Sequence, residues 1–123
     1  MNRAVLVVDD EPDLAETCER LLTLAGWKVT TAISRAGALA ALAAGPPPAL
    51  ALVDRHLSDG DGLDVLRAAR ALGTPVIVMS GRTSEENRRR TLAEGAVRFL
   101  TKPFIARELL DLARAIAGDP RGP

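Results

Sequence analysis

The chain has 123 residues, of which 47% are apolar and 26% are charged, the proportions of an ordinary soluble globular protein of one domain. Sixteen basic and sixteen acidic residues cancel, which argues against a surface built to hold nucleic acid or a membrane. The single cysteine, Cys18, excludes an internal disulfide, and neither a signal-peptide pattern nor a membrane-spanning apolar run is present, so we expect a cytoplasmic protein.

Apolar runs alternate along the chain with segments of helical spacing. The runs predict five strands, at residues 4–8, 28–31, 49–53, 75–79 and 97–100. Apolar residues three and four positions apart predict five helices, around residues 14–25, 36–42, 63–69, 92–93 and 109–116. Pro12 suits a first helical turn, and Ser34 and either Thr83 or Ser84 suit N-caps.

Five strands alternating with five helices predict an α/β fold, a doubly wound parallel sheet with helices on both faces. In such sheets ligands bind beyond the carboxyl ends of the strands. Polar side chains follow four of the five predicted strands there, namely Asp9 and Asp10, Asp54, Ser80, and Lys102. With the strand order 2-1-3-4-5, three carboxylates, a hydroxyl and an ammonium converge on one rim.

The first of these groups, in the stretch "VLVVDDEPD", places adjacent carboxylates where a buried strand ends. Like charges this close repel and raise each other's pKa unless a cation or hydrogen-bond donors compensate. The carboxylates are therefore either solvated turn and cap residues or ligands of a cation.

Four stretches of the chain resemble the receiver domains of two-component response regulators, in that family's order and spacing. They are "VVDDEP", "LVDRHLSDGDG", "VIVMSG" and "FLTKPF", each at a predicted strand end. The resemblance covers essentially the whole chain and implies a flavodoxin-like fold with strand order 2-1-3-4-5. The chain departs from the family at Ser58, where proline is usual, which removes some turn rigidity but no functional group.

The resemblance implies that Asp54 accepts a phosphoryl group from a histidine kinase, and that Lys102 and Ser80 contact the phosphoryl oxygens. A carboxylate that attacks a phosphorylated histidine must approach a dianion, so positive charge has to be supplied. Lys102 is a point charge suited to a phosphoryl oxygen, and Ser80 can donate a hydrogen bond. The product would be an aspartyl phosphate.

The resemblance also implies a Mg²⁺ ion, or Mn²⁺ in its place. Asp10, helped by Asp9, would hold it together with Asp54 and the backbone carbonyl of His56. Carboxylates, a carbonyl, waters and phosphate oxygens are the ligands that Mg²⁺ prefers.

Four residues are expected to flank the site: the side chain of His56, then Gly81, Arg82 and Pro103. Gly81 leaves room for a phosphate beside Ser80. The family has a cis peptide bond at the position of Lys102 and Pro103, which we expect here as well.

Ser80 and Phe99 match the switch positions of the family. Ser80 would move toward the phosphate, and Phe99 would turn inward to fill the space that it leaves. Phe99 has no hydroxyl, so it can be buried without leaving a polar group unsatisfied. The alternatives are a plain strand end for Ser80 and a permanent core position for Phe99.

Four functions compete. The favoured one is a signalling switch that catalyses its own phosphorylation and dephosphorylation and is not a conventional enzyme. An aspartate-nucleophile phosphatase of the haloacid dehalogenase type needs a second aspartate two residues after the nucleophile, where this chain has His56. A flavodoxin-like cofactor binder needs a hydroxyl- and glycine-rich loop in place of "DDEPD". A receiver-like docking module without phosphorylation would normally lack one of the site residues.

Residues 1–118 are expected to form the receiver domain, and residues 119–123 a flexible tail or the start of a linker. The expected partners are a sensor histidine kinase or phosphotransfer protein, and a downstream protein or fused output domain, with no direct contact to nucleic acid or membrane. The fourth helix, fifth strand and fifth helix would form the switching surface and could join two copies in a homodimer. This surface carries Arg88, Arg89, Arg90, Arg98 and Arg107.

Overall fold

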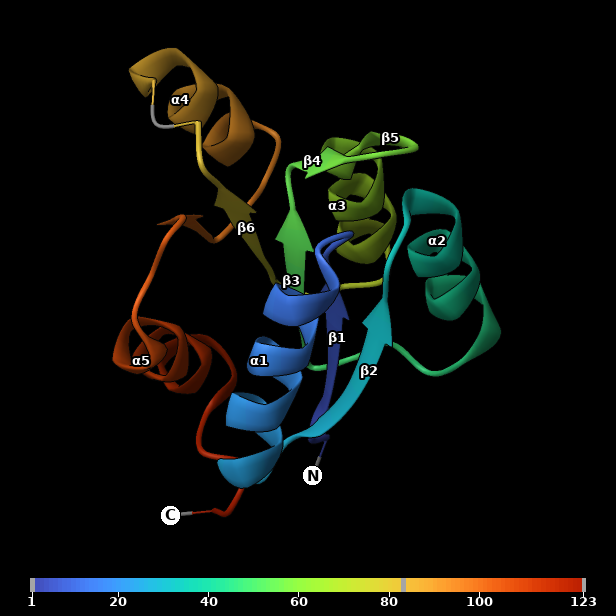
Figure 1. Ribbon diagram of the computed structural model, residues 1–123. Helices are drawn as coiled ribbons and strands as arrows, with labels where there is room; N and C mark the ends of the chain where they lie inside the picture. Colours follow the sequence, from blue (N-terminus) through green and yellow to red (C-terminus); the bar gives the residue numbers. More distant parts are fainter. Residues whose placement is uncertain (1, 83, 123) are drawn as a thin grey trace.

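Five parallel strands form the central sheet of the computed structural model, which describes residues 2–82 and 84–122. The strands are β1 (Ala4–Val8), β2 (Lys28–Ala32), β3 (Leu50–Asp54), β6 (Val76–Ser80) and β7 (Arg98–Thr101). Their order, β2-β1-β3-β6-β7, confirms the predicted order 2-1-3-4-5 and the doubly wound fold. The five strands are parallel, so their carboxyl ends share a single rim, and the arrows of β1, β2 and β3 show this direction (Figure 1).

Four of the five strands end one residue later than predicted, and this affects the site. Asp54 pairs with Met79 and Ser80 pairs with Thr101, so both polar residues are still part of the hydrogen-bonded sheet. The apolar pattern ends one residue before the backbone ladder does, because the ladder depends on main-chain groups and not on side-chain polarity. The acceptor candidate is therefore fixed to a rigid strand.

Five helices connect and cover the strands: α1 (Pro12–Leu24), α2 (Arg35–Ala44), α3 (Gly62–Ala71), α4 (Glu85–Ala93) and α5 (Ala106–Ala117). Ser34 caps α2 and Ser84 caps α4, as predicted, each accepting a backbone N–H from the third residue beyond it. Thr83, the other candidate cap, lies outside the described residues.

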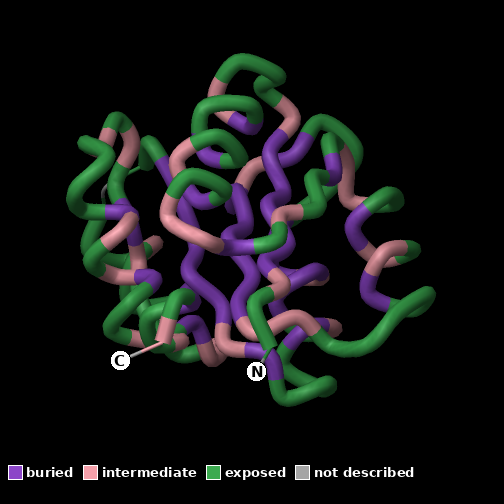
Figure 2. The backbone as a smooth tube through the Cα atoms, turned by 90° about the horizontal axis from the view of Figure 1, so that it is seen from below, coloured by how far each residue is buried: buried purple, intermediate pink, exposed green. Residues whose placement is uncertain are grey.

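Two hydrophobic cores lie on opposite faces of the sheet. Val5 and Val7 of β1 pack with Cys18 and Leu22 of α1 and with residues of α5. The alternate residues of β1 pack against α2 and α3, in a core that also includes Leu66. Strand side chains alternate between faces, so a run of consecutive apolar residues supplies both cores. Buried residues accordingly concentrate in the strands, and exposed residues lie on the outside (Figure 2).

A short hairpin that the sequence analysis did not predict follows β3. It consists of β4 (His56–Leu57) and β5 (Gly60–Asp61) and runs over the carboxyl end of the sheet (Figure 1). The predicted glycine-rich turn into the third helix lies in this segment. A Cβ atom on Gly62 would lie 2.1 Å from the carbonyl oxygen of Asp54, so only glycine fits there.

The last described residues pack against the turn between α1 and β2. Pro120 is buried, and the Arg121 guanidinium donates a hydrogen bond to the carbonyl of Leu24. The domain boundary at residue 118 stays a prediction. In the part of the chain that the structure describes, no helix has the length and apolar character needed to cross a membrane.

Candidate functional site

The sheet brings together four predicted site residues that are up to 93 positions apart in sequence. Asp9 directly follows β1, Asp54 ends β3, Ser80 ends β6 and Lys102 directly follows β7. Strands β1, β3, β6 and β7 are consecutive neighbours in the sheet, so these residues form a row along the rim. The predicted row is observed for Asp9, Asp54, Ser80 and Lys102, but Asp10 does not join the group of carboxylates that the structure forms.

The Lys102 ammonium lies among the carboxylates. Its Nζ is 2.9 Å from Asp9 Oδ2, 3.1 Å from Asp54 Oδ2 and 3.6 Å from Glu11 Oε1. Burial alone would lower the pKa of Lys102, but the hydrogen bonds and charges of Asp9 and Asp54 outweigh it and raise that pKa. Lys102 is therefore a fixed cation at neutral pH. The Lys102–Pro103 peptide bond is cis, as expected.

Asp54, the candidate phosphoryl acceptor, is buried, with 4% of its surface exposed. Its Oδ1 accepts a hydrogen bond from the His56 N–H at 3.1 Å, and its Oδ2 faces Lys102. Burial is the largest influence and raises the pKa of Asp54, although both donors and the charge of Lys102 act in the opposite direction. Burial thus disfavours the charged form of Asp54 more than the neighbouring donors favour it.

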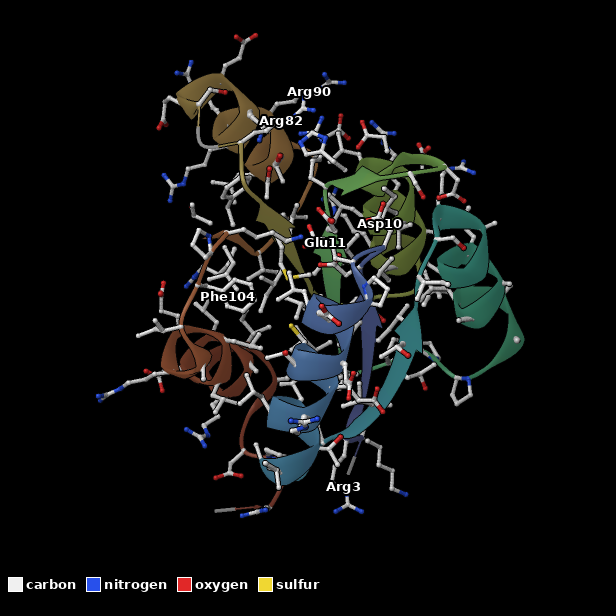
Figure 3. All side chains as sticks on the ribbon, viewed as in Figure 1. Arg3, Asp10, Glu11, Arg82, Arg90 and Phe104 are labelled. Atoms are coloured by element: carbon white, nitrogen blue, oxygen red, sulfur yellow. The ribbon has the colours of Figure 1, made fainter. Side chains whose placement is uncertain are left out.

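Three carboxylates could hold a metal ion: oxygens of Asp9, Glu11 and Asp54 lie within 4.8 Å of one another. Asp9 is fully buried, and its Oδ1 accepts the Glu11 N–H at 2.9 Å, which turns the loop after β1 back toward the sheet. Asp10, the principal ligand by resemblance, is not in this group of described residues. Figure 3 shows Asp10 and Glu11 on the loop between β1 and α1.

The residues of this group fit a divalent cation. Hard oxygen donors are what Mg²⁺ selects, and a cation beside Asp54 would offset the burial that raises the pKa of this carboxyl. Glu11 was not among the predicted ligands. The Asp9 side chain closes an Asx-type turn by accepting the Glu11 N–H, and this turn places Glu11 beside Asp9 and Asp54. Such a turn gives only a weak signal in the sequence.

An open pocket of about 680 Å³ gives access to the Asp54 carboxylate. Six of the predicted site residues line it: Asp54, His56, Gly81, Arg82, Lys102 and Pro103. The sequence analysis missed Leu14 and Thr17 of α1 and Phe104, which also line the pocket. Phe104 lies on the segment that leads into α5 (Figure 3).

His56 lies beside Asp54, and its side chain is half-buried. Burial first, and then the charges of Arg82 and Arg55, lower the pKa of this imidazole. Its Nε2 has no hydrogen-bond partner among the described residues. A neutral imidazole therefore borders the pocket at pH 7.

The two predicted switch residues occupy neighbouring strands. Ser80 is fully buried, and its Oγ accepts the Arg82 N–H at 3.0 Å. Phe99 is half-buried on β7, one residue before the buried Leu100. The switching roles of Ser80 and Phe99 stay predictions.

Arg55 is a buried charged residue that the sequence analysis did not identify. It directly follows Asp54, and its side chain is 7% exposed. Its partners lie as far as 36 residues away along the chain, and no local pattern indicates them.

A doubly wound sheet with this acidic and lysine-containing rim defines the class of signalling receivers. The family description "Response regulator receiver domain" matches residues 5–114, and the chain belongs to this family.

Relatives with known names agree with this assignment. The chain is 44% identical over 112 residues to the transcriptional regulatory protein KdpE of Mycobacterium tuberculosis, covering 90% of this chain and 49% of that protein. It therefore spans about half the length of this curated relative.

Solved structures agree as well. A receiver domain protein (CheY-like) from Methanospirillum hungatei superposes with a TM-score of 0.89 at 28% identity, covering 98% of both chains. A response regulator from Burkholderia pseudomallei, described with a phosphorylated aspartic acid, a calcium ion and citrate, has a TM-score of 0.84 at 25% identity. That match covers 98% of this chain and 69% of the other.

Proposed function

We propose that Asp54 is the phosphoryl acceptor of this receiver domain and that a histidine kinase or phosphotransfer protein is the donor. The observation that carries the proposal is the geometry of Asp54, a buried carboxylate on a rigid strand that lines an open pocket and faces Lys102 at 3.1 Å. The Burkholderia pseudomallei relative, whose description includes a phosphorylated aspartic acid, supports the same chemistry.

In the transfer, an Asp54 carboxylate oxygen forms a bond to phosphorus while the bond between phosphorus and the donor imidazole nitrogen breaks. The electron pair of that bond returns to the imidazole, which takes up a proton. Lys102 lies where it can neutralise charge on the phosphoryl oxygens. Hydrolysis of the aspartyl phosphate by water would return Asp54 to its starting state.

Asp9 and Asp54 are the carboxylates best placed to hold Mg²⁺ or Mn²⁺, and the backbone carbonyl of His56 remains a candidate ligand. Glu11 and Asp10 are the alternatives for a further carboxylate. When bound, the ion supplies positive charge that lets one anion approach another.

The relatives support a proposal for the partners of the whole protein. KdpE is a transcriptional regulatory protein and is about twice as long as the matched region, so a fused output domain is one partner that we propose. A separate downstream protein is the other. The face formed by α4, β7 and α5 carries exposed arginines and suits a homodimer or an acidic partner. A cytoplasmic location fits a kinase-driven receiver.

The decisive test of the proposed function is Asp54→Asn, which keeps the side-chain size and removes the nucleophilic charge. Incubation with acetyl phosphate and Mg²⁺ should add about 80 Da to the wild-type protein, the mass of one phosphoryl group, and nothing to the variant. Mass spectrometry of the intact proteins reads this out, and Asp13→Asn, an exposed carboxylate at the edge of the same pocket, is the control. Equal labelling of wild type and Asp54→Asn would refute the assignment and favour another function on this fold.

A second prediction separates the two candidate carboxylates of the metal site. Asp10→Ala should weaken Mn²⁺ binding more than Glu11→Ala, because Asp10 matches the ligating position of the family and the Glu11 side chain is 67% exposed and solvated. We expect about a tenfold loss of affinity, or ~1.4 kcal/mol, for Asp10→Ala, measured by electron paramagnetic resonance of free Mn²⁺. A larger loss for Glu11→Ala would assign the ligand to the group seen in the structure.

A further inference from the structure

Helix α4 has little apolar contact with the rest of the domain. Its sequence, "EENRRRTLA", is almost entirely polar, and among its nine described residues only Thr91 is buried. Leu92 is partly buried against the core. The helix stands at the edge of the molecule beyond β6 (Figure 1). Since a helix without an apolar face gains little from burial, other contacts must fix its position.

The buried guanidinium of Arg55 supplies those contacts. Its Nη1 donates to Thr91 Oγ1 at 3.2 Å and to Asn87 Oδ1, and both acceptors belong to α4. On the other side, its Nε donates to Asp61 Oδ1 of β5 at 2.9 Å. Arg55 thus ties α4 to the loop that directly follows Asp54. A buried guanidinium that lost its partners would strongly destabilise the fold, so the positions of Arg55 and its acceptors are tightly restrained.

The same network reaches the predicted switch residue Ser80. Asn87 accepts from Arg55 and also donates from Nδ2 to the carbonyl of Arg82 at 2.9 Å. The Arg82 N–H in turn donates to Ser80 Oγ at 3.0 Å. Arg82 lies in the loop that leads from β6 into α4 (Figure 3). Any displacement of Ser80 toward Asp54 must break its hydrogen bond with Arg82 or carry this loop and Asn87 along.

We propose that Arg55 is a positioning residue that restrains α4 and the β6–α4 loop in the arrangement of the free protein, and that this restraint opposes the binding of a phosphoryl group at Asp54. The inference rests on the proposed function. The proposed restraint implies that the hydrogen bonds from Arg55 to Asn87 and Thr91 break when Ser80 moves. Loosening those bonds should therefore favour the phosphorylated arrangement, since a ligand shifts an equilibrium toward the state that it prefers.

The test uses Asn87→Ala and Thr91→Val, which weaken the restraint without altering the residues around Asp54. Beryllofluoride, a phosphoryl mimic, is titrated into each protein with Mg²⁺ and followed by NMR. The beryllofluoride concentration at half saturation should be about fivefold lower for each variant than for wild type. This difference corresponds to the net free energy of about one hydrogen bond. The matched control is Arg89→Ala, which removes an exposed side chain from the same helix and should bind as wild type does.

Two further measurements make the outcome decisive. In Arg55→Met, which keeps an apolar stem and removes the guanidinium, Thr91→Val should have no additional effect if the two residues act through each other. Wild-type affinity in Asn87→Ala and Thr91→Val, or an affinity lower than wild type, would overturn the restraint but leave the role of Asp54 intact. A wild-type protein that does not bind beryllofluoride would overturn the proposed function, and the restraint with it.

Discussion

The balance of charge among a few buried residues dominates the chemistry of this site. Asp9 and Asp54 are both buried and share a single ammonium, that of Lys102. Two carboxylates against one ammonium leave an excess of negative charge, and burial raises the pKa of Asp54. A buried site with this charge is suited to a divalent cation and an incoming phosphoryl group.

Asp54 gives a prediction for the dependence of stability on pH. Its pKa in the folded protein is raised above 3.8, so the folded state binds more protons in the range just above pH 3.8. The free energy of unfolding attributable to Asp54 therefore falls as the pH rises through that range. Asp54→Asn removes this penalty and should be more stable than wild type at pH 7. The advantage should disappear as the pH falls below 3.8.

Urea unfolding of both proteins between pH 3 and pH 8, without divalent metal, measures this difference. Asp13→Asn, at an exposed carboxylate, serves as the control for a general loss of negative charge. A variant less stable than wild type at pH 7 would show that attraction to Lys102 outweighs burial.

At the scale of elements, the helices differ in how firmly they are bound to the sheet. Helix α2 has a serine cap, two further N–H groups bonded to Asp59, and the buried residues Ala38 and Leu42. Helix α4 has a serine cap and the Arg55 network, but little apolar surface in the core. A helix with much buried apolar surface opens only when the whole domain unfolds. Helix α4 buries little apolar surface, so it should open locally before the domain unfolds.

The caps test this difference. Ser84→Ala removes the acceptor of the Asn87 N–H and should destabilise α4 by about 1 kcal/mol. The effect should appear as roughly fivefold faster amide exchange within residues 85–93, with the global urea midpoint almost unchanged. Ser34→Ala, the matched loss of a cap on α2, should instead lower the global midpoint. Equal effects of both variants on global unfolding would contradict the weak attachment of α4.

At the scale of the whole molecule, stability and chemistry occupy different regions. The two cores lie between the sheet and the helices that cover its two faces, and include residues such as Leu22 and Leu66. The polar groups lie at the carboxyl ends of the strands, next to the pocket. Parallel topology causes this separation, because every strand that enters the core emerges at the same rim.

Much of this arrangement could be predicted from the sequence. Apolar runs that end in Asp54 and Ser80 locate the strands, and the motifs fix their order through the family resemblance. The row of Asp9, Asp54, Ser80 and Lys102 follows, because the backbone geometry of a parallel sheet leaves their positions little freedom. These features depend on local periodicity and on a common topology, and both are readable along the chain.

Other features were decided only by the tertiary structure. Glu11, and not Asp10, joins Asp9 and Asp54, because a turn closed by one side-chain hydrogen bond sets the direction of the loop. The partners of Arg55 on α4 are 32 and 36 residues away, and they bind it because a buried guanidinium must find acceptors wherever the fold brings them. Specific pairings of side chains between loops leave no periodic trace, so they emerge only when the chain has folded.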